Sequence, residues 1–239
     1  LSAKTILYEE LIWSVAGMYK SIIFNKLLLL IAFAFCPLAA LSADSDGDGV
    51  EDIQDAYPED ATRQYLPLVE ALAKIEDPSL RTCVENQHGA RETAGEVLDI
   101  NCQNLGVASL RGIEHFTKLE RLWLNDSNLT ELSPLSDLVD LLFLNISWGS
   151  RSITDISALG GLSKLQWLDM EGQRIADFSP LASLLDIEHL QIGHSLLSDL
   201  GQLGEKPNLT DLKINQSLVR EILDLSFAPK LERLHASDL

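Results

Sequence analysis

The sequence predicts an α/β solenoid, with short parallel strands on the concave face, irregular or 3-10 turns on the convex face and helices capping the N-terminal end. Two observations predict this fold. Apolar residues recur every 22 residues from Val97 onward, and within each repeat their spacing changes from two residues to three. A content of 46% apolar residues in a chain of 239 is enough to fill a core, which excludes a disordered chain.

The repeat follows the template LxxLxLxxxxLxxLxxLxxL, which is clearest in LERLWLNDSNLTELSPLSDL. Six complete units and a partial seventh begin at Val97, Leu119, Leu141, Leu165, Ile187, Leu209 and Leu231. Every step is 22 residues except one of 24, where the run WGSRS lengthens a turn by two residues. We interpret the alternating part of each unit as a strand and the rest as loose turns. Neighbouring coils close the core, because one coil cannot bury its own apolar face.

These units resemble leucine-rich repeats of the short, internalin-type class, and DISALGGL and FSPLASL match the outer segment of that family. The resemblance covers residues 97–239 and implies adhesion or surface recognition, without a particular partner. The family usually carries Asn at the ninth position of each unit. Here that position holds Leu105, Ser127, Gly149, Gln173, Ser195 and Ser217. The asparagine ladder is therefore absent, and we expect Ser and Gln to satisfy some of the turn amides.

Residues 61–96 lack the repeat and predict a helical cap over the first coil. The first helix is expected to place Leu66, Val69 and Ala73 on one face. A second helix is expected to begin at Asp77-Pro78, a capping residue followed by proline, and to end at His88-Gly89. It would bring Leu80, Cys83 and Val84 together.

Cys83 and Cys102 are the two cysteines that follow the N-terminal 43 residues. One lies on the predicted capping helix and the other at an inward position of the first strand. In an exported chain this pair favours a disulfide over two buried thiols.

The N-terminal 43 residues predict export. Residues 18–43 run from a basic stretch through LLLLIAFAF to a small-residue exit, the layout of a signal peptide. Residues 1–17 carry two glutamates ahead of this leader, which indicates a start placed too far upstream and Met18 as the true start. Cleavage fits after Ala43 or after Ser42; the alternative is an uncleaved anchor. Cleavage would leave no membrane span and a secreted, periplasmic or cell-surface protein.

Residues 44–60, DSDGDGVEDIQDAYPED, contain eight carboxylates and no basic residue. Their spacing favours a calcium loop over a plain acidic linker. The expected ligands are Asp44, Asp46, Asp48, Asp52 and Asp55, with the carbonyl of Val50. Gly49 lies at the sixth position, where the chain must turn sharply for the oxygens to converge on one Ca²⁺. The run resembles a single thrombospondin type 3 repeat, which implies an extracellular, weak calcium site.

Strand side chains alternate, so the third and fifth residues of each unit are expected on the concave face. The third-position row reads Asp99, Arg121, Phe143, Trp167, His189, Asp211, Arg233, and the fifth reads Asn101, Trp123, Asn145, Asp169, Gln191, Lys213, His235. Aromatic residues clustered on a concave surface beside cations are typical of a binding hot spot. We predict partner contacts by Arg121, Trp123, Phe143, Trp148, Trp167, His189 and Lys213. The alternative is that the aromatic residues only stabilise neighbouring strands.

The formal net charge of -18 excludes a nucleic-acid binder. No interpretable catalytic motif is present, and His189 and His194 lack a third zinc ligand, so we expect no enzyme. The sequence favours an exported module that binds a protein or glycan. The alternative is a structural spacer, or a truncated fragment of a larger cell-surface adhesin, because the seventh unit stops without a polar cap.

Overall fold

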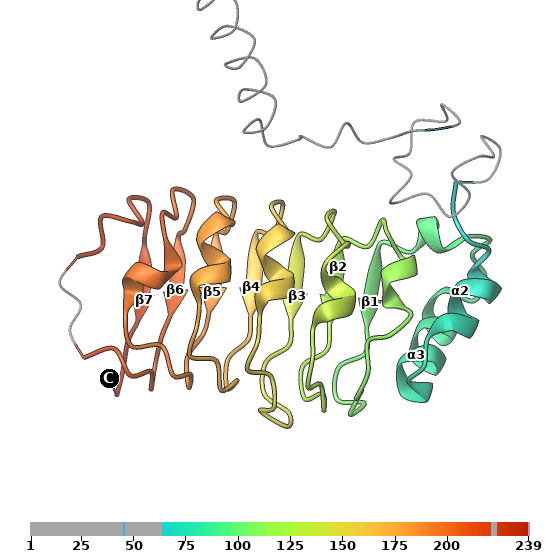
Figure 1. Ribbon diagram of the computed structural model, residues 1–239, viewed down its shortest axis with the longest axis horizontal. Helices are drawn as coiled ribbons and strands as arrows, with labels where there is room; N and C mark the ends of the chain where they lie inside the picture. Colours follow the sequence, from blue (N-terminus) through green and yellow to red (C-terminus); the bar gives the residue numbers. More distant parts are fainter. Residues whose placement is uncertain (1–44, 46–63, 221–223, 239) are drawn as a thin grey trace, which may run out of the picture. The chain divides into compact units, whose positions relative to one another are not determined.

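A computed structural model describes residues 45, 64–220 and 224–238, which all belong to the unit Asp44–Leu239. In this part of the chain seven strands form one parallel sheet whose spatial order follows the sequence (Figure 1). The strands are β1 Asp99–Asn101, β2 Arg121–Trp123, β3 Phe143–Asn145, β4 Trp167–Asp169, β5 His189–Gln191, β6 Asp211–Lys213 and β7 Arg233–His235. The predicted leucine-rich-repeat solenoid is confirmed.

The middle residue of each strand forms the inner wall of the core. Ile100 pairs with Leu122 and Leu122 with Leu144, and the same register continues to β7. From β1 to β6 this residue is fully buried, whereas Leu234 in β7 is 36% exposed because no further described coil packs on it. Each coil thus completes the core of the one before it.

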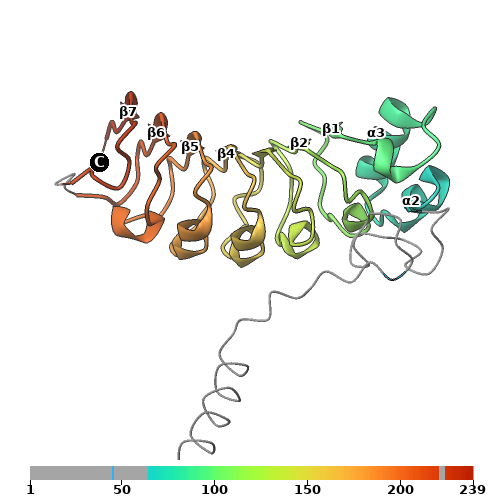
Figure 2. The same cartoon turned by 90° about the horizontal axis from the view of Figure 1, so that it is seen from above.

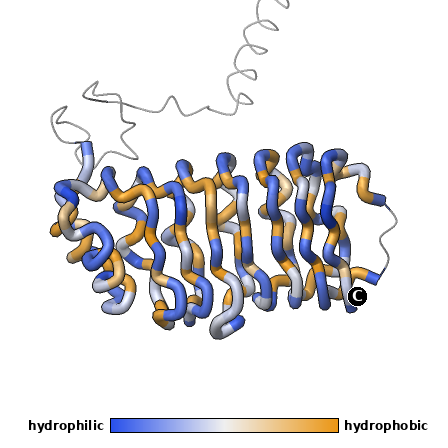
Figure 3. Tube along the Cα trace, turned by 180° about the vertical axis from the view of Figure 1, so that it is seen from behind, coloured by the Kyte–Doolittle hydropathy of each residue, from blue (hydrophilic) through white to orange (hydrophobic). Residues whose placement is uncertain are grey.

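Short 3-10 helices form the opposite wall of the solenoid (Figure 2). They are η2 Ile113–His115, η3 Ser133–Leu135, η4 Ser157–Gly161, η5 Ser179–Ser183 and η6 Leu200–Leu203, and η1 Ala94–Glu96 precedes β1. The period-three leucines fill the space between strands and helices, as Leu135, Leu159 and Leu181 do with no exposed surface. Figure 3 shows the same alternation as hydrophobic stretches that recur from coil to coil between hydrophilic ones.

A backbone ladder joins the turns that follow the strands. The eighth residue of every unit has a positive φ: Asn104, Asp126, Trp148, Gly172, His194, Gln216 and Asp238. In the first six units its N–H donates to the seventh-position carbonyl of the next coil, over 2.7 to 3.0 Å. These bonds satisfy turn amides that no asparagine side chain reaches.

Ninth-position side chains add to this ladder. The Nε2 of buried Gln173 donates to the carbonyls of Ile146 and Trp148, at 2.9 and 2.7 Å. Gln173 therefore bonds carbonyls rather than the amides that the sequence suggested. The hydroxyls of Ser195 and Ser217 do accept from amides two residues further on.

Among the described residues, two α-helices precede the first coil: α2 Leu68–Lys74 and α3 Pro78–His88. The predicted inner face of the first helix is wrong. Its buried residues are Leu68 and Ala71, while Val69 is 73% exposed. The helix begins only after Pro67, so its buried face starts at Leu68 and continues three residues later at Ala71.

The second helix agrees with the sequence. Leu80, Cys83 and Val84 are buried, and the Asp77 carboxylate caps the helix by accepting from the N–H groups of Ser79 and Leu80. Its other oxygen accepts from Ala108 and Ser109 in the first coil. Burial alone would raise the pKa of Asp77, but these four N–H groups hold it below its usual value. One carboxylate thus ties the cap to the solenoid.

The predicted disulfide is confirmed: Cys83 on α3 bonds Cys102 just after β1, with an S–S distance of 2.05 Å. This bond provides a second link between cap and solenoid. No helix in the described part of the chain is long and apolar enough to cross a membrane.

Lys206 breaks the apolar template, because it occupies the last apolar position of its unit yet is fully buried. Its ammonium donates to the carbonyls of Leu181, Leu203 and Glu205. Burial lowers the pKa of Lys206 from 10.5 to about 8, although the charge of Glu205 raises it. The sequence pattern gave no sign that a lysine would fill this core position.

We expect Lys206→Met to lower the free energy of unfolding by about 2 kcal/mol, because three carbonyls lose their donor. Between pH 8 and 10.5 the unfolded lysine holds a proton that the folded one has released, so wild-type stability rises with pH in this window. The gap between wild type and variant in urea unfolding should therefore widen from pH 7.5 to pH 10. A gap that narrows would contradict this.

Candidate functional site

The parallel register aligns equivalent outward-facing residues into rows. Asp99, Arg121, Phe143, Trp167, His189, Asp211 and Arg233 are consecutive partners across the sheet, and so are Asn101, Trp123, Asn145, Asp169, Gln191, Lys213 and His235. The two rows that the sequence predicts on the concave face therefore lie side by side. Whatever this face recognises would meet residues from several coils at once.

Four rings form a continuous stack, which we call the aromatic strip: Trp123, Phe143, Trp167 and His189. Successive ring centroids are 4.8, 5.6 and 4.2 Å apart, with interplanar angles of 37°, 25° and 31°. All four side chains are only partly buried. The strip crosses strands β2 to β5; the Phe143–Trp167 contact is stacked, and the two end contacts are tilted.

Charged residues border both ends of the strip. Arg121 is exposed, with a guanidinium nitrogen 3.8 Å from a carboxylate oxygen of Glu120. At the other end Asp211 accepts from Arg233 at 2.9 Å and lies 3.9 Å from the Nδ1 of His189. The global excess of acid is thus not reproduced around the strip, where both signs are present.

Lys213 lies on the same face, but its charge is already compensated. Its ammonium is 2.6 Å from the buried carboxylate of Glu171, which also lies 3.6 Å from the Nε2 of His194. Beside them, burial raises the pKa of Asp169, the bond from the Glu171 N–H lowers it, and the charge of Glu171 raises it again. The net direction is upward. Lys213 therefore belongs to this charged cluster rather than to the strip.

Trp148 lies outside the strip, on the lengthened turn. Its ring centroid is 5.0 Å from that of His194, and the guanidinium of Arg151 lies 5.4 Å from it. Of the seven predicted partner-binding residues, the structure therefore joins four in the strip, sets Arg121 beside them and places Trp148 and Lys213 in other clusters.

The sequence predicts one metal site, for calcium. The calcium ligands Asp44, Asp46, Asp48, Val50, Asp52 and Asp55 lie outside the described residues. Within the described ranges no three His, Cys, Asp or Glu side chains are grouped as a metal site would require.

Sequence reasoning missed two arginines, Arg151 and Arg174, which line a pocket beside the lengthened turn. The two-residue insertion was the available signal. The insertion breaks the repeat template at this turn. The sequence therefore does not show which residues of the turn point into the pocket.

Comparisons with known proteins agree with the leucine-rich-repeat fold. An internalin (InlF) of Listeria monocytogenes matches with 30% identity and a TM-score of 0.64, over 72% of this chain and 53% of its own. The functional domain of InlJ from the same organism, described as including a cysteine ladder, matches with 18% identity and a TM-score of 0.53, over 70% and 42%.

The described part of the protein is thus a leucine-rich-repeat solenoid, similar in fold to this internalin. The chain spans about half the length of the internalin that it matches. No protein-family model matches the sequence, and no curated protein does.

We expect Phe143→Ala to increase acrylamide quenching of tryptophan fluorescence, because the central ring of the strip shields faces of Trp123 and Trp167. Leu185→Ala serves as the control, since Leu185 is 49% exposed and contributes no ring to the strip. Equal quenching in both variants would show that the rings do not shield each other in solution.

Proposed function

We propose that this protein is an exported, non-enzymatic binding module that recognises a protein ligand through the aromatic strip. One observation supports the proposal: four partly exposed rings from four successive coils lie in a row on the outward-facing side of the strands. Binding hot spots are enriched in tryptophan and are surrounded by polar residues. The strip, with Arg121 and Asp211 at its ends, has this composition.

The stacking favours a protein over a glycan. A sugar ring binds an aromatic residue by lying on its open face, but the ring centroids of the strip are only 4.2 to 5.6 Å apart, which leaves no room for a sugar between two rings. The ring edges remain available to contact a partner. Apolar side chains of a protein can pack against a row of edges, since that contact needs no flat platform.

The second candidate is a structural spacer in which the strip only stabilises adjacent strands. The close centroid distances support it, because cross-strand aromatic pairs are stabilising in themselves. Deleting one whole 22-residue coil outside the strip separates the two functions. A spacer would lose activity in proportion to its length, whereas a receptor would keep its affinity if the strip were intact.

We expect Trp123→Ala with Trp167→Ala to weaken ligand binding by roughly 30-fold or more, the loss expected of a hot spot. A ligand is first isolated by cross-linking extracellular proteins to the wild-type chain, and the purified ligand is then titrated. Leu185→Ala and Leu218→Ala are matched controls, since both remove exposed apolar side chains elsewhere. Circular dichroism confirms the fold of each variant. Unchanged binding by the tryptophan variant would favour the spacer.

Export is the second part of the proposal. The Cys83–Cys102 disulfide supports it, because such bonds persist mainly in oxidising compartments. N-terminal sequencing of the protein after expression in a secreting host is expected to begin at Asp44, or at Ala43 if cleavage follows Ser42. A mature chain that retains Glu9 would refute both the leader and Met18 as the start.

Calcium binding by residues 44–60 is the third part. The argument rests on chemistry and spacing: five carboxylates and the Val50 carbonyl supply hard oxygen ligands in the order that a calcium loop requires. Bound Ca²⁺ would neutralise part of the most acidic stretch of the chain.

Titration calorimetry with CaCl₂ is expected to give a dissociation constant of roughly 10⁻⁴ to 10⁻³ M, the range of extracellular modules. Asp46→Asn with Asp48→Asn should abolish the signal, since both remove ligand charges. Glu59→Gln removes a carboxylate from the same stretch outside the ligand positions and should leave it unchanged. No calcium-dependent heat in the wild-type protein would remove the proposal.

A further inference from the structure

The lengthened turn after β3 forms one wall of a pocket of about 830 Å³. Figure 1 shows this loop reaching further than the corresponding loops of neighbouring coils. The opposite wall comes from the next two coils. Six polar or charged side chains line the pocket: Ser150, Arg151, Ser152, Thr154, Arg174 and His194. It is separate from the aromatic strip, because none of the four strip residues lines it.

Trp148 holds the pocket's first arginine in place. The Arg151 guanidinium lies 5.4 Å from the indole centroid, a cation–π contact. The indole in turn packs on Gly172, where a Cβ would lie only 2.9 Å from Cε3 of Trp148. Gly172 also has a φ of 88°, which favours glycine. The backbone at Gly172 therefore makes room for the ring that positions Arg151.

In the described part of the chain the guanidinium groups of Arg151 and Arg174 have no acidic partner. Among the described residues neither Arg151 nor Arg174 forms a salt bridge, whereas seven other lysine and arginine side chains do. Two carboxylates adjoin lining residues in sequence. That of Glu171, next to Gly172, lies 3.6 Å from the Nε2 of His194 and 2.6 Å from the ammonium of Lys213. That of Asp155, next to Thr154, accepts from the N–H of Ser157 at 2.8 Å. The charge of Glu171 is thus offset, and the two arginines leave a local positive excess.

This local excess of positive charge favours a negatively charged ligand, although the net charge of the whole chain is -18. At physiological ionic strength the screening length is about 8 Å, so distant carboxylates contribute little at the pocket. Guanidinium groups form paired hydrogen bonds with tetrahedral and planar oxyanions. The volume far exceeds one inorganic anion and falls in the range of sites for small organic ligands, roughly 300 to 1,000 Å³.

We propose that this pocket binds an acidic saccharide, with Arg151 and Arg174 gripping its sulfate or phosphate ester. The hydroxyls of Ser150, Ser152 and Thr154 would meet the sugar's own hydroxyl groups. The strip and the pocket would then be two separate binding sites, one for a protein and one for an anionic sugar.

Calorimetry with the full chain tests the proposal, using four probes: a heparin-derived sulfated disaccharide, its desulfated form, glucose 6-phosphate and inorganic sulfate. The sulfated or phosphorylated sugar should bind, at least tenfold more tightly than the desulfated one. Arg151→Ala and Arg174→Ala should each weaken it about tenfold. The two charged sugars distinguish a sulfate from a phosphate ester. Equal binding of the desulfated sugar, or no saturable binding of either charged sugar, would overturn the proposal.

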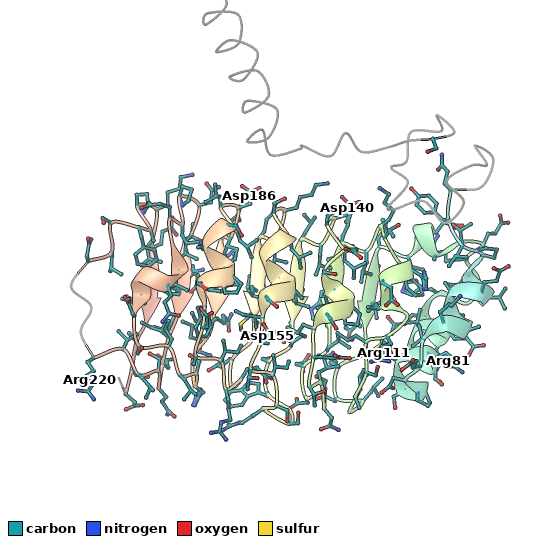
Figure 4. All side chains as sticks on the ribbon, in the orientation of Figure 1. Arg81, Arg111, Asp140, Asp155, Asp186 and Arg220 are labelled. Atoms are coloured by element: carbon teal, nitrogen blue, oxygen red, sulfur yellow. A yellow bond between two sulfur atoms is a disulfide. The ribbon has the colours of Figure 1, made fainter. Side chains whose placement is uncertain are left out.

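Arg220→Ala is the matched control. Arg220 is an exposed arginine near the C-terminal end of the solenoid, and it does not line the pocket (Figure 4). It should bind like wild type, and an equal loss there would show a diffuse charge effect instead of a site. Inorganic sulfate binding as tightly as the sugars would overturn the assignment to a saccharide. The Trp123→Ala, Trp167→Ala variant should keep its affinity for the sugar. A failure of the saccharide proposal can therefore be told apart from a failure of the proposed protein binding by the strip.

Discussion

Every coil of this solenoid depends on its neighbours for a core. A strand of three residues carries one buried leucine, and that side chain is shielded only because the next coil places an identical one beside it. This burial fixes the register of the whole sheet, since a slip of one residue would turn each leucine toward solvent. Leu234 shows the contrary case, since it is 36% exposed in the last described strand.

The same register creates the surface features. When the leucines of neighbouring strands align on the inner side, the residues before and after them align on the outer side. Rings from four successive coils therefore become neighbours in one strip. The departure from the 22-residue step has an equally local effect. Two extra residues leave the strands in register but open a pocket at the turn, lined by arginines that the regular coils do not place together.

Buried polar groups inside the repeat also find hydrogen-bond partners in neighbouring coils. The usual asparagine ladder is replaced by a backbone ladder from the eighth position and by bonds from Gln173. Lys206 occupies an apolar position, and three carbonyls surround its ammonium. Buried donors and acceptors need partners, but the fold does not dictate which side chains provide them.

The sequence by itself determined the repeat, its strands and the rows of outward-facing residues, because these follow from spacing alone. It favoured the disulfide for another reason, the expected export of the chain. It also gave the start and end of α3, whose capping residues are local. Only the tertiary structure decided which face of α2 is buried, that Lys213 is paired with Glu171, and that Arg151 and Arg174 share a pocket. Those outcomes depend on contacts between coils and on the exact course of irregular turns, and a periodic pattern contains no information about either.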